Sequence, residues 1–424
     1  MRPLTTLSRR DFVSTAGAAL AAPLILTRLS HASTAANERI SVGFIGMGIR
    51  ARGLLRGWLG SSDIQVIGVC DVDTSRRESS RQMVDGHYGE SDCADCGDYR
   101  ELLDRDDVDA VVIATPDHWH ANIVLDACLA GKDIYCEKPL TITLREAQLM
   151  IEAVRKHERV FQTGSQQRTE YGHRFVQACE YVRNGRIGEI ISVNVGVGPA
   201  PVPCDLPEEP LEPGLDWDRW LGPAPRRPYN SVLSPRGVHN HYPGWRRYRE
   251  YAGGPMADMG AHHFDIAQWG LGMDHSGPVR VVPPADPQAK YGAMVVYENG
   301  VKLIHGGPSG VTFVGRDGLI AVDRGRINAA PDNLFDQPIT DSDEQLPRWP
   351  NHLANFVSCV RDRSRPICDV EIGARSVAIC HLMNLAYIHG RELTWDPQAW
   401  RFDDDDANGW LDYQRREGYE LPQI

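Results

Sequence analysis

The stretch from Ser41 to Ala51, SVGFIGMGIRA, decides the fold of the first half of the chain. Its five leading residues are mostly apolar and predict a buried β-strand, and Gly46 and Gly48 follow where that strand would end. Glycines permit a tight turn and let a ligand approach the backbone, and the helical pattern that follows would direct its N-terminus at phosphate groups. The stretch therefore predicts the turn of a dinucleotide-binding unit. The residues expected to contact the dinucleotide in this turn are Gly46, Met47, Gly48, Ile49 and Arg50.

Three further apolar runs have the character of strands, namely Ile64–Cys70, Ala110–Ala114 and Asp133–Cys136. Helical patterns separate them, which is typical of a parallel sheet covered by helices on both faces. We therefore expect a doubly wound, Rossmann-type α/β domain over residues 37–163.

The residue that closes the second strand, Asp71, bears on the choice of dinucleotide. A carboxylate there can bond to the adenosine ribose hydroxyls and would repel a 2′-phosphate, so NAD is expected over NADP. Arg76 and Arg77 lie nearby in the sequence and keep NADP as the less favoured choice.

The second half of the chain, residues 164–424, has a different pattern. Its expected elements are a helix over about 168–183, strands at 190–195, 293–298 and 301–305, a proline-rich loop over about 198–228, and helices over about 351–361 and 371–387. Glu298–Gly300 between two of these strands is a hairpin signal. The pattern predicts an α+β domain with an open, mostly antiparallel sheet and helices on one side.

Residues 1–36 have the three parts of an export signal. Paired arginines in Ser8–Phe12 precede an apolar run over Val13–Leu26 and a stretch of small residues. The paired arginines match a twin-arginine signal, and the apolar run is shorter than the roughly 20 residues that a transmembrane helix needs. We therefore expect a periplasmic or otherwise exported protein, with the twin-arginine (Tat) export machinery as a partner and no stable membrane span after signal removal.

Charge and cysteine content narrow the classes of partner. A formal net charge of -12 argues against nucleic acid and anionic membranes, because phosphates repel an acidic surface. Of the ten cysteines, Cys93 and Cys96 form a lone C-x-x-C motif without a second pair, so no metal site is expected. These two cysteines either pair with each other or stay reduced.

The loop Thr115–His120, TPDHWH, follows the run at Ala110–Ala114 and should pass near the cofactor. Thr115, Pro116 and His120 are expected to contact it. Trp119 either stacks on a sugar ring or packs within the loop.

Two more motifs complete a pattern that is known from one family. Glu137-Lys138-Pro139 follows the run at Asp133–Cys136, and residues 258–265 read DMGAHHFD. With the glycine turn and Thr115-Pro116, they make the chain resemble the Gfo/Idh/MocA oxidoreductases, named for glucose-fructose oxidoreductase, inositol dehydrogenase and a rhizopine catabolism protein. The resemblance implies a pyranose or cyclitol substrate. It also implies a C-terminal sheet that often forms the oligomer interface, and hence a homodimer or homotetramer.

The resemblance further implies roles for single residues. Lys138 matches the family's active-site lysine, and Asp258 and His262 match its aspartate and histidine pair. Glu137 is expected to contact the nicotinamide ribose region, and the Lys138-Pro139 bond is expected to be cis.

The chemistry of these residue types agrees with those roles. Asp258 and His262 stand four residues apart on an expected helix, so they share a face and can hydrogen-bond. Oxidation of an alcohol needs a base for the hydroxyl proton, for which histidine is suited, and a lysine can stabilise the developing alkoxide. Which of Lys138 and His262 takes the proton stays open. His263 is expected to pack or to make a second contact.

Contacts to the substrate are expected from three further residues. Arg168 opens the second domain and could hold a sugar hydroxyl or carboxylate. His239 and Trp245 lie in a polar-aromatic loop that suits either sugar recognition or an oligomer interface.

The sequence therefore predicts an NAD-dependent oxidoreductase that acts on a hydroxyl of a sugar, glycoside or cyclitol. Because an exported protein meets no free nicotinamide pool, we expect the cofactor to stay tightly bound and to be recycled in place. One alternative is redox-neutral glycoside cleavage through a transient keto-sugar, although the Tyr-Pro-Thr-His stretch of the best-known exported NAD-dependent glycosidases is absent. A second alternative is a non-catalytic sugar-binding protein.

Overall fold

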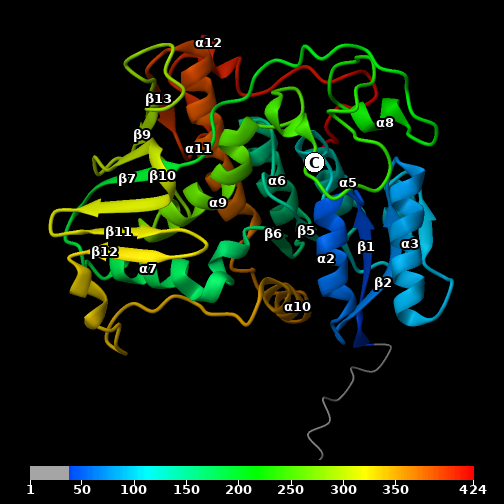
Figure 1. The fold of residues 1–424 in the computed structure, drawn as a ribbon, viewed down its shortest axis with the longest axis horizontal. Coiled ribbons are helices and arrows are strands. Elements are labelled where there is room, and N and C mark those ends of the chain that lie inside the picture. The colour runs from blue at the N-terminus through cyan, green and yellow to red at the C-terminus, as the bar shows by residue number, and fades with distance from the viewer. Residues whose placement is uncertain (1–37) are drawn as a thin grey trace, which may run out of the picture. The chain divides into compact units, whose positions relative to one another are not determined.

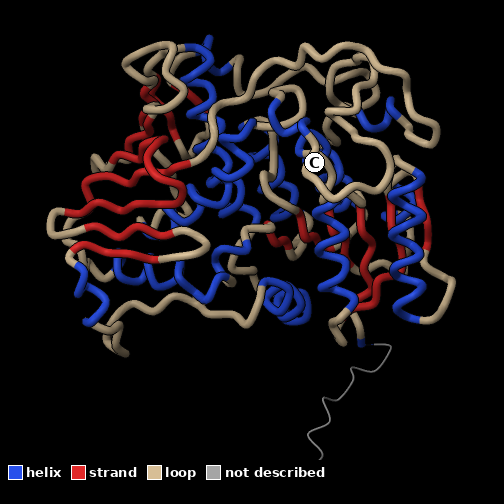
Figure 2. The backbone as a smooth tube through the Cα atoms, viewed as in Figure 1, coloured by secondary structure: helices blue, strands red, loops and turns tan. Residues whose placement is uncertain are grey.

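The computed structural model describes residues 38–424, and residues 40–424 form one compact unit. The predicted export signal, residues 1–36, lies outside the described residues. The compact unit contains two sheets, each with helices packed against it, as Figures 1 and 2 show. Between residues 38 and 424 no helix is long and apolar enough to cross a membrane.

The first sheet has six parallel strands in the order β3-β2-β1-β4-β5-β6. The strands are β1 (Ile40–Ile45), β2 (Ile64–Cys70), β3 (Ala94–Cys96), β4 (Ala110–Ile113), β5 (Asp133–Cys136) and β6 (Phe161–Thr163). The helices between them are α2 (Ile49–Leu59), α3 (Thr74–Tyr88), α4 (Arg100–Leu103), α5 (His120–Leu129) and α6 (Leu144–Lys156). Every residue of β4 and β5 is buried, as expected for central strands covered on both faces. The predicted doubly wound parallel sheet is confirmed.

The second sheet has eight strands and only antiparallel pairs. Seven follow in the order β12-β11-β10-β9-β8-β13-β14, and β7 pairs with β10. The strands are β7 (Ile190–Gly196), β8 (Arg280–Val282), β9 (Met294–Val296), β10 (Lys302–Gly315), β11 (Leu319–Val322), β12 (Ile327–Ala330), β13 (Leu393–Asp396) and β14 (Arg401–Phe402). This confirms the predicted antiparallel C-terminal domain.

The helices of the C-terminal domain connect its sheet to the first one. They are α7 (Arg174–Arg183), α8 (Trp217–Leu221), α9 (Gly254–Gly270), α10 (His352–Asp362), α11 (Val370–His389) and α12 (Asp405–Asn408). Helices α7, α9 and α11 contact strands of the second sheet, and α11 also packs against α6 beside the first sheet. The two sheets are therefore held together by a shared layer of helices.

Two elements differ from the sequence prediction. The helix expected from about 168 begins only at Arg174, because Tyr171, Gly172 and His173 have φ values of 59°, 65° and 55°, which interrupt a right-handed helix. The strand expected at 301–305 continues to Gly315, and β10 pairs with β9 at its start and with β11 near its end.

All ten cysteines carry free thiols, Cys93 and Cys96 included. Burial raises the pKa of the Cys93 thiol to about 12, which keeps it protonated at neutral pH.

Arg168 is buried inside the C-terminal domain, with an exposed fraction of 1%. Its guanidinium donates two hydrogen bonds to Asp265, at 2.8 and 2.9 Å, and two to Asp274, at 2.8 and 2.9 Å. This corrects the expectation that Arg168 binds a substrate, because its donors are already satisfied by two carboxylates of its own domain.

Replacing Arg168 by Gln is expected to lower the free energy of unfolding by about 3–5 kcal/mol, because the fully buried Asp265 would keep no cation. Thermal unfolding followed by circular dichroism measures the change. Arg316→Gln is the matched control: this arginine pairs with Glu189 at 2.9 Å, but both side chains are exposed, so it should cost less than about 1 kcal/mol. Equal shifts of the two midpoints would contradict the structural role of Arg168.

Candidate active site

The glycine turn lies at the carboxyl end of β1, where the strand order reverses between β1 and β4. Gly46 has a φ of +85°, and a Cβ on it would lie 2.8 Å from the backbone nitrogen of Thr115, so glycine is required there. A Cβ on Gly48 would meet nothing within 4 Å, so this position faces open space. Helix α2 begins after Gly48 without a side-chain cap, which leaves amide groups of its first turn available to an anion.

A cavity of about 580 Å³ opens in front of this turn. Gly46, Gly48, Ile49 and Arg50 line it on the side of the first sheet. Residues of the C-terminal domain line the other side, including Trp220, Leu233, Ser234, His239, Trp245 and Arg246. The cavity therefore lies between the carboxyl ends of the first sheet's strands and the segment of the C-terminal domain that runs from α8 to Arg246, so both parts of the chain form it.

The Asp71 carboxylate lies at the cavity, where the sequence predicted a ribose contact. It accepts hydrogen bonds from the backbone nitrogens of Met47, at 2.6 Å, and Asp73, at 2.8 Å. Burial raises the pKa of Asp71, and the charge of Arg76 opposes that rise. The Met47 side chain packs in the apolar core behind β1, so the predicted cofactor contact of this residue falls to its backbone.

Glu137, directly after β5, forms an ion pair with Arg50 of the glycine turn. Its carboxylate accepts hydrogen bonds from Arg50 Nε at 2.8 Å and from Gln166 Nε2 at 3.0 Å. Glu137 is buried, whereas about a third of the Arg50 side chain, 35%, is exposed. The ion pair therefore fixes the position of Arg50 at the cavity.

Lys138 bridges the first sheet and α9. Its Nζ donates to the backbone oxygen of Asp258 at 2.7 Å and to Asp258 Oδ1 at 2.9 Å. Burial alone would raise the pKa of Asp258, but the charges of Lys138 and Arg246 outweigh it and lower that pKa. The Lys138-Pro139 bond is cis, as the resemblance implied.

His262 lies one turn after Asp258 on α9, but the two residues do not form the expected hydrogen bond. The Asp258 carboxylate bonds to Lys138 instead, and in the described part of the chain the buried Nδ1 of His262 has no hydrogen-bond partner. Burial, with the charge of Lys138, lowers the pKa of His262 well below its usual value. His263 is also buried, with a pKa lowered to about 4. Both imidazoles are therefore neutral at neutral pH.

The loop after β4 contributes two kinds of residue. Thr115 and Pro116 line the cavity, and the buried Thr115 Oγ1 has no partner among residues 38–424. His120 is fully buried, with ring nitrogens 2.8 Å from the Pro139 oxygen and 3.0 Å from the Thr115 oxygen, so it positions this loop rather than contacting a cofactor as expected.

Trp119 forms part of the cavity wall, and its Nε1 donates to the backbone oxygens of Arg219 and Trp220, at 3.0 and 3.1 Å. These bonds and the 5.6 Å edge contact with Tyr419 favour the packing role over sugar stacking.

Three residues of the polar-aromatic loop line the cavity, namely His239, Trp245 and Arg246. The Arg246 guanidinium lies 4.2 Å from the centre of the Trp245 ring, and its Nε lies 3.9 Å from Asp258 Oδ1. The Lys138–Asp258 pair therefore adjoins the cavity.

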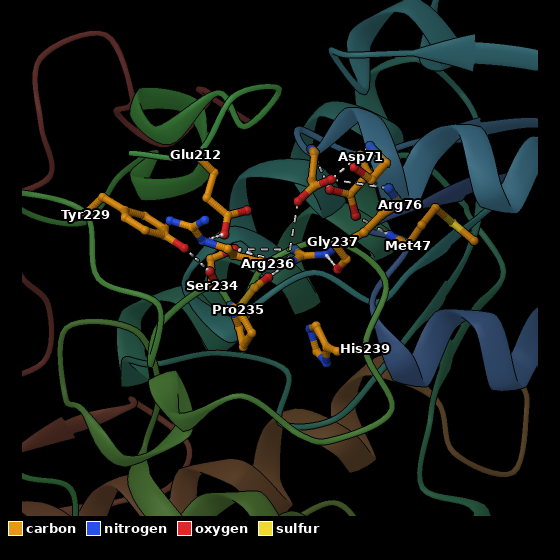
Figure 3. Close-up of polar contacts among 12 residues, drawn as sticks. Met47, Asp71, Arg76, Glu212, Tyr229, Ser234, Pro235, Arg236, Gly237 and His239 are labelled. Carbon is orange, nitrogen blue, oxygen red and sulfur yellow. Dashed lines mark hydrogen bonds and ion pairs between the residues drawn. The ribbon is translucent and has the colours of Figure 1, made fainter. Parts of the chain in front are cut away.

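Residues 234–239, which we call the strap, cross from the C-terminal domain to the first sheet. Figure 3 shows Arg76 of α3 beside Asp71 and hydrogen-bonded to the strap. The Arg76 guanidinium donates to Ser234 Oγ at 3.3 Å, to the Gly237 oxygen at 3.2 Å and to the Pro235 oxygen. Arg52 of α2 donates to the backbone oxygen of His239.

The sequence prediction missed two cations of the site. Arg246 was visible only as one member of a mixed polar-aromatic loop. Arg324 lies in the turn between β11 and β12, where Asp323-Arg324-Gly325 signals a hairpin tip but not what the tip faces. Arg324 acts electrostatically on His262 and His263, where its charge adds to burial in lowering their pKa values.

The chain matches two family profiles and is similar to several curated proteins. Residues 40–165 match the oxidoreductase family with an NAD-binding Rossmann fold, and residues 203–421 match its C-terminal alpha/beta domain. An inositol 2-dehydrogenase from Salmonella paratyphi B is 31% identical over 157 residues, 37% of this chain and 45% of the relative. A "glycosyl hydrolase family 109 protein" from Shewanella pealeana is 27% identical over 210 residues, 44% of each. The chain thus spans less than half the length of these relatives.

Solved structures share the fold at low identity. The aldose-aldose oxidoreductase from Caulobacter crescentus has a TM-score of 0.59 and 18% identity, covering 84% of this chain and 99% of its own. The WlbA dehydrogenase from Bordetella pertussis, solved with NADH and UDP-GlcNAcA, has a TM-score of 0.59, 17% identity and the same coverage. These likenesses concern the fold alone. Because the family profiles match most of the chain, on both sheets, it belongs to the Gfo/Idh/MocA oxidoreductase family.

Proposed function

We propose that this protein is an NAD-dependent oxidoreductase that oxidises a hydroxyl group of a sugar, glycoside or cyclitol. One observation carries the proposal: the Lys138–Asp258 ion pair lies beside Arg246, which lines the cavity that begins at the glycine turn, and the neutral His262 lies one turn further along α9. The similarity to an inositol 2-dehydrogenase supports the substrate class.

The residues of the cavity fit a dinucleotide. The open space at Gly48, the uncapped start of α2 and the unpartnered Thr115 Oγ1 offer room and hydrogen-bonding groups to a phosphate-bearing ligand. Asp71 favours NAD. The two arginines that left NADP open are already bonded within the protein, because Arg76, which lines the cavity, donates to the strap and Arg77 pairs with Asp95.

A bound nicotinamide dinucleotide would supply the hydride acceptor for the carbon that bears the substrate hydroxyl. His262 is the proposed acceptor of the hydroxyl proton, since its imidazole is neutral and one ring nitrogen lacks a partner within residues 38–424. Lys138 stabilises the oxygen as it loses that proton, and Asp258 holds the ammonium in position.

Replacing Lys138 by Met is expected to lower kcat/KM for sugar oxidation by about 100- to 1,000-fold, because the developing alkoxide would lose its cation. The assay follows nicotinamide absorbance over a panel of sugars, glycosides and inositols. Lys156→Met, at an exposed position of α6, is the control and should retain wild-type rates. Wild-type turnover by Lys138→Met would refute the catalytic proposal and favour a binding protein.

The acid limb of the pH profile is expected to lie well below pH 6.5. A general base works in its neutral form, and burial and the charge of Lys138 keep His262 neutral at pH values where an ordinary histidine, with a pKa of about 6.5, is half protonated. Measured kcat/KM should therefore stay level from about pH 8 to pH 6, and His262→Asn should abolish the acid limb. A midpoint at or above pH 6.5 would contradict this assignment.

We further propose that the cofactor stays bound through the catalytic cycle. The strap supports this, because Ser234 and His239 line the cavity next to Asp71 while Arg76 and Arg52 fasten the strap to α3 and α2. Two further contacts hold the strap to the C-terminal domain (Figure 3). The Tyr229 hydroxyl donates to the Ser234 oxygen at 2.8 Å, and Arg236 pairs with Glu212 at 2.6 Å.

Replacing Arg76 by Gln is expected to speed cofactor release by at least about 10-fold, since the strap would lose most of its hydrogen bonds to α3. Native mass spectrometry of the purified protein over time measures the bound fraction. Arg81→Gln on the same helix is the control. The Arg81 side chain is 42% exposed, and its ion pair with Asp95 is long, at 3.6 Å. Equal release rates for both variants would show that the strap does not retain the cofactor.

A redox-neutral glycosidase is the second candidate. The similarity to a "glycosyl hydrolase family 109 protein" favours it, and a retained cofactor suits a cycle of oxidation, elimination and reduction. Release of free sugar from a glycoside without net change of nicotinamide absorbance would distinguish it from a net dehydrogenase.

We also propose export through the twin-arginine pathway and assembly as a homodimer or homotetramer. The paired arginines before an apolar run support export, and the open second sheet supports self-association. Cell fractionation of the wild type beside an Arg9→Lys, Arg10→Lys variant tests the first, and light scattering tests the second.

A further inference from the structure

Arg324 has an unusual position for a charged side chain. It lies at the tip of the β11–β12 hairpin, which extends from the second sheet toward the first one (Figure 1). Its Nε is buried, yet within residues 38–424 the guanidinium makes no hydrogen bond or ion pair, and it lies 5.0 Å from the centre of the Tyr171 ring. A partly buried cation without a counterion is costly, which suggests that a ligand supplies one.

The surroundings of Arg324 identify the site to which it belongs. Burial is the main cause of the low pKa values of His262 and His263, and the charge of Arg324 lowers both further. The same charge helps to lower the pKa of Asp258, after burial, Lys138 and Arg246. The charge of Arg324, whose guanidinium lies 5.0 Å from the centre of the Tyr171 ring, therefore acts on the part of α9 where the proposed proton acceptor lies.

Positive charge exceeds negative charge around this part of α9. Lys138, Arg246 and Arg324 share one ionised carboxylate, that of Asp258. Arg246 is also positioned by stacking, 4.2 Å from the Trp245 ring centre and 5.0 Å from that of Tyr242.

Four other carboxylates near the site do not remove this excess. Glu137 is engaged by Arg50 at 2.8 Å, and Asp323 by Arg326 at 3.2 Å. Burial opposes the charged forms of Asp117 and Glu170 and raises the pKa of both carboxyl groups.

We propose that the substrate is an anionic sugar derivative, bearing a carboxylate or a phosphate, and that Arg324 binds its charged group. A guanidinium can donate two parallel hydrogen bonds to either group, and Arg246 adds positive charge beside it. The inference rests on the proposed function, because it names the class of sugar that the same site oxidises. Arg324 would then be a determinant of specificity rather than of the chemical step.

The test compares neutral and anionic forms of the same hexoses. For glucose, galactose and mannose, kcat/KM is measured for the free sugar, the uronate and the 6-phosphate with the cofactor-loaded wild type, and the uronate and phosphate arms separate the two anions. We expect an anionic form to exceed its neutral parent by at least about 10-fold. Arg324→Gln should raise KM for that form by about 10- to 100-fold, with little change of kcat or of the neutral parent's rate.

Arg316→Gln is the control, because Arg316 lies in the turn before β11 and pairs with the exposed Glu189. Its KM for the anionic form should match that of the wild type, and thermal unfolding checks that both variants fold. Equal effects of the two substitutions, or a preference for the neutral sugars, would overturn the inference while leaving the proposed oxidation in place.

Binding tests the inference even if no hexose is oxidised, a result that would count against the proposed function alone. Glucuronate and glucose 6-phosphate are titrated onto the loaded wild type and both variants by calorimetry. Binding that Arg324→Gln weakens and Arg316→Gln does not supports the anion site. Binding of neither anion by the wild type, or equal binding by all three proteins, overturns it.

Discussion

The ion pair between Lys138 and Asp258 connects the two parts of this protein at the point where its chemistry is proposed to occur. The two residues are 120 positions apart, one directly after β5 and the other on α9, and Lys138 bonds to both the carboxylate and the backbone oxygen of Asp258. Removing charges from water is costly unless they are paired, so this contact fixes β5 and α9 relative to each other. The position of His262, one turn further along α9, follows from it.

Burial and charge then give each polar group of the site a distinct state. Burial keeps His262 and His263 neutral, while the charges of Lys138 and Arg246 keep Asp258 ionised. Glu137 accepts hydrogen bonds from Arg50, at the glycine turn, and from Gln166, at the start of the C-terminal domain, so one polar network connects the two parts of the chain. A base, a cation and a binding cavity are thereby held side by side.

Local charge at the site differs from the charge of the whole chain. The formal net charge of -12 describes the surface as a whole and argues against polyanionic partners. The region around Asp258 instead gathers Lys138, Arg246 and Arg324. A small anion inside a cavity interacts with these nearby groups more strongly than with distant, solvent-screened carboxylates. An acidic protein can therefore have a site suited to an anionic substrate.

The sequence by itself determined the strand, glycine turn and helix at Ser41–Ala51, the acidic end of β2 and the parallel and antiparallel character of the two sheets. These features depend on local patterns: alternation, apolar runs, and a backbone conformation at Gly46 that favours glycine. Only the tertiary structure decided that Arg168 is buried against Asp265, that Asp258 pairs with Lys138 and not with His262, and that the charge of Arg324 acts on α9. Ion pairs form between residues as far as 298 positions apart, as for Asp63 and Arg361, and no local pattern specifies which charged groups the packing of the sheets brings together.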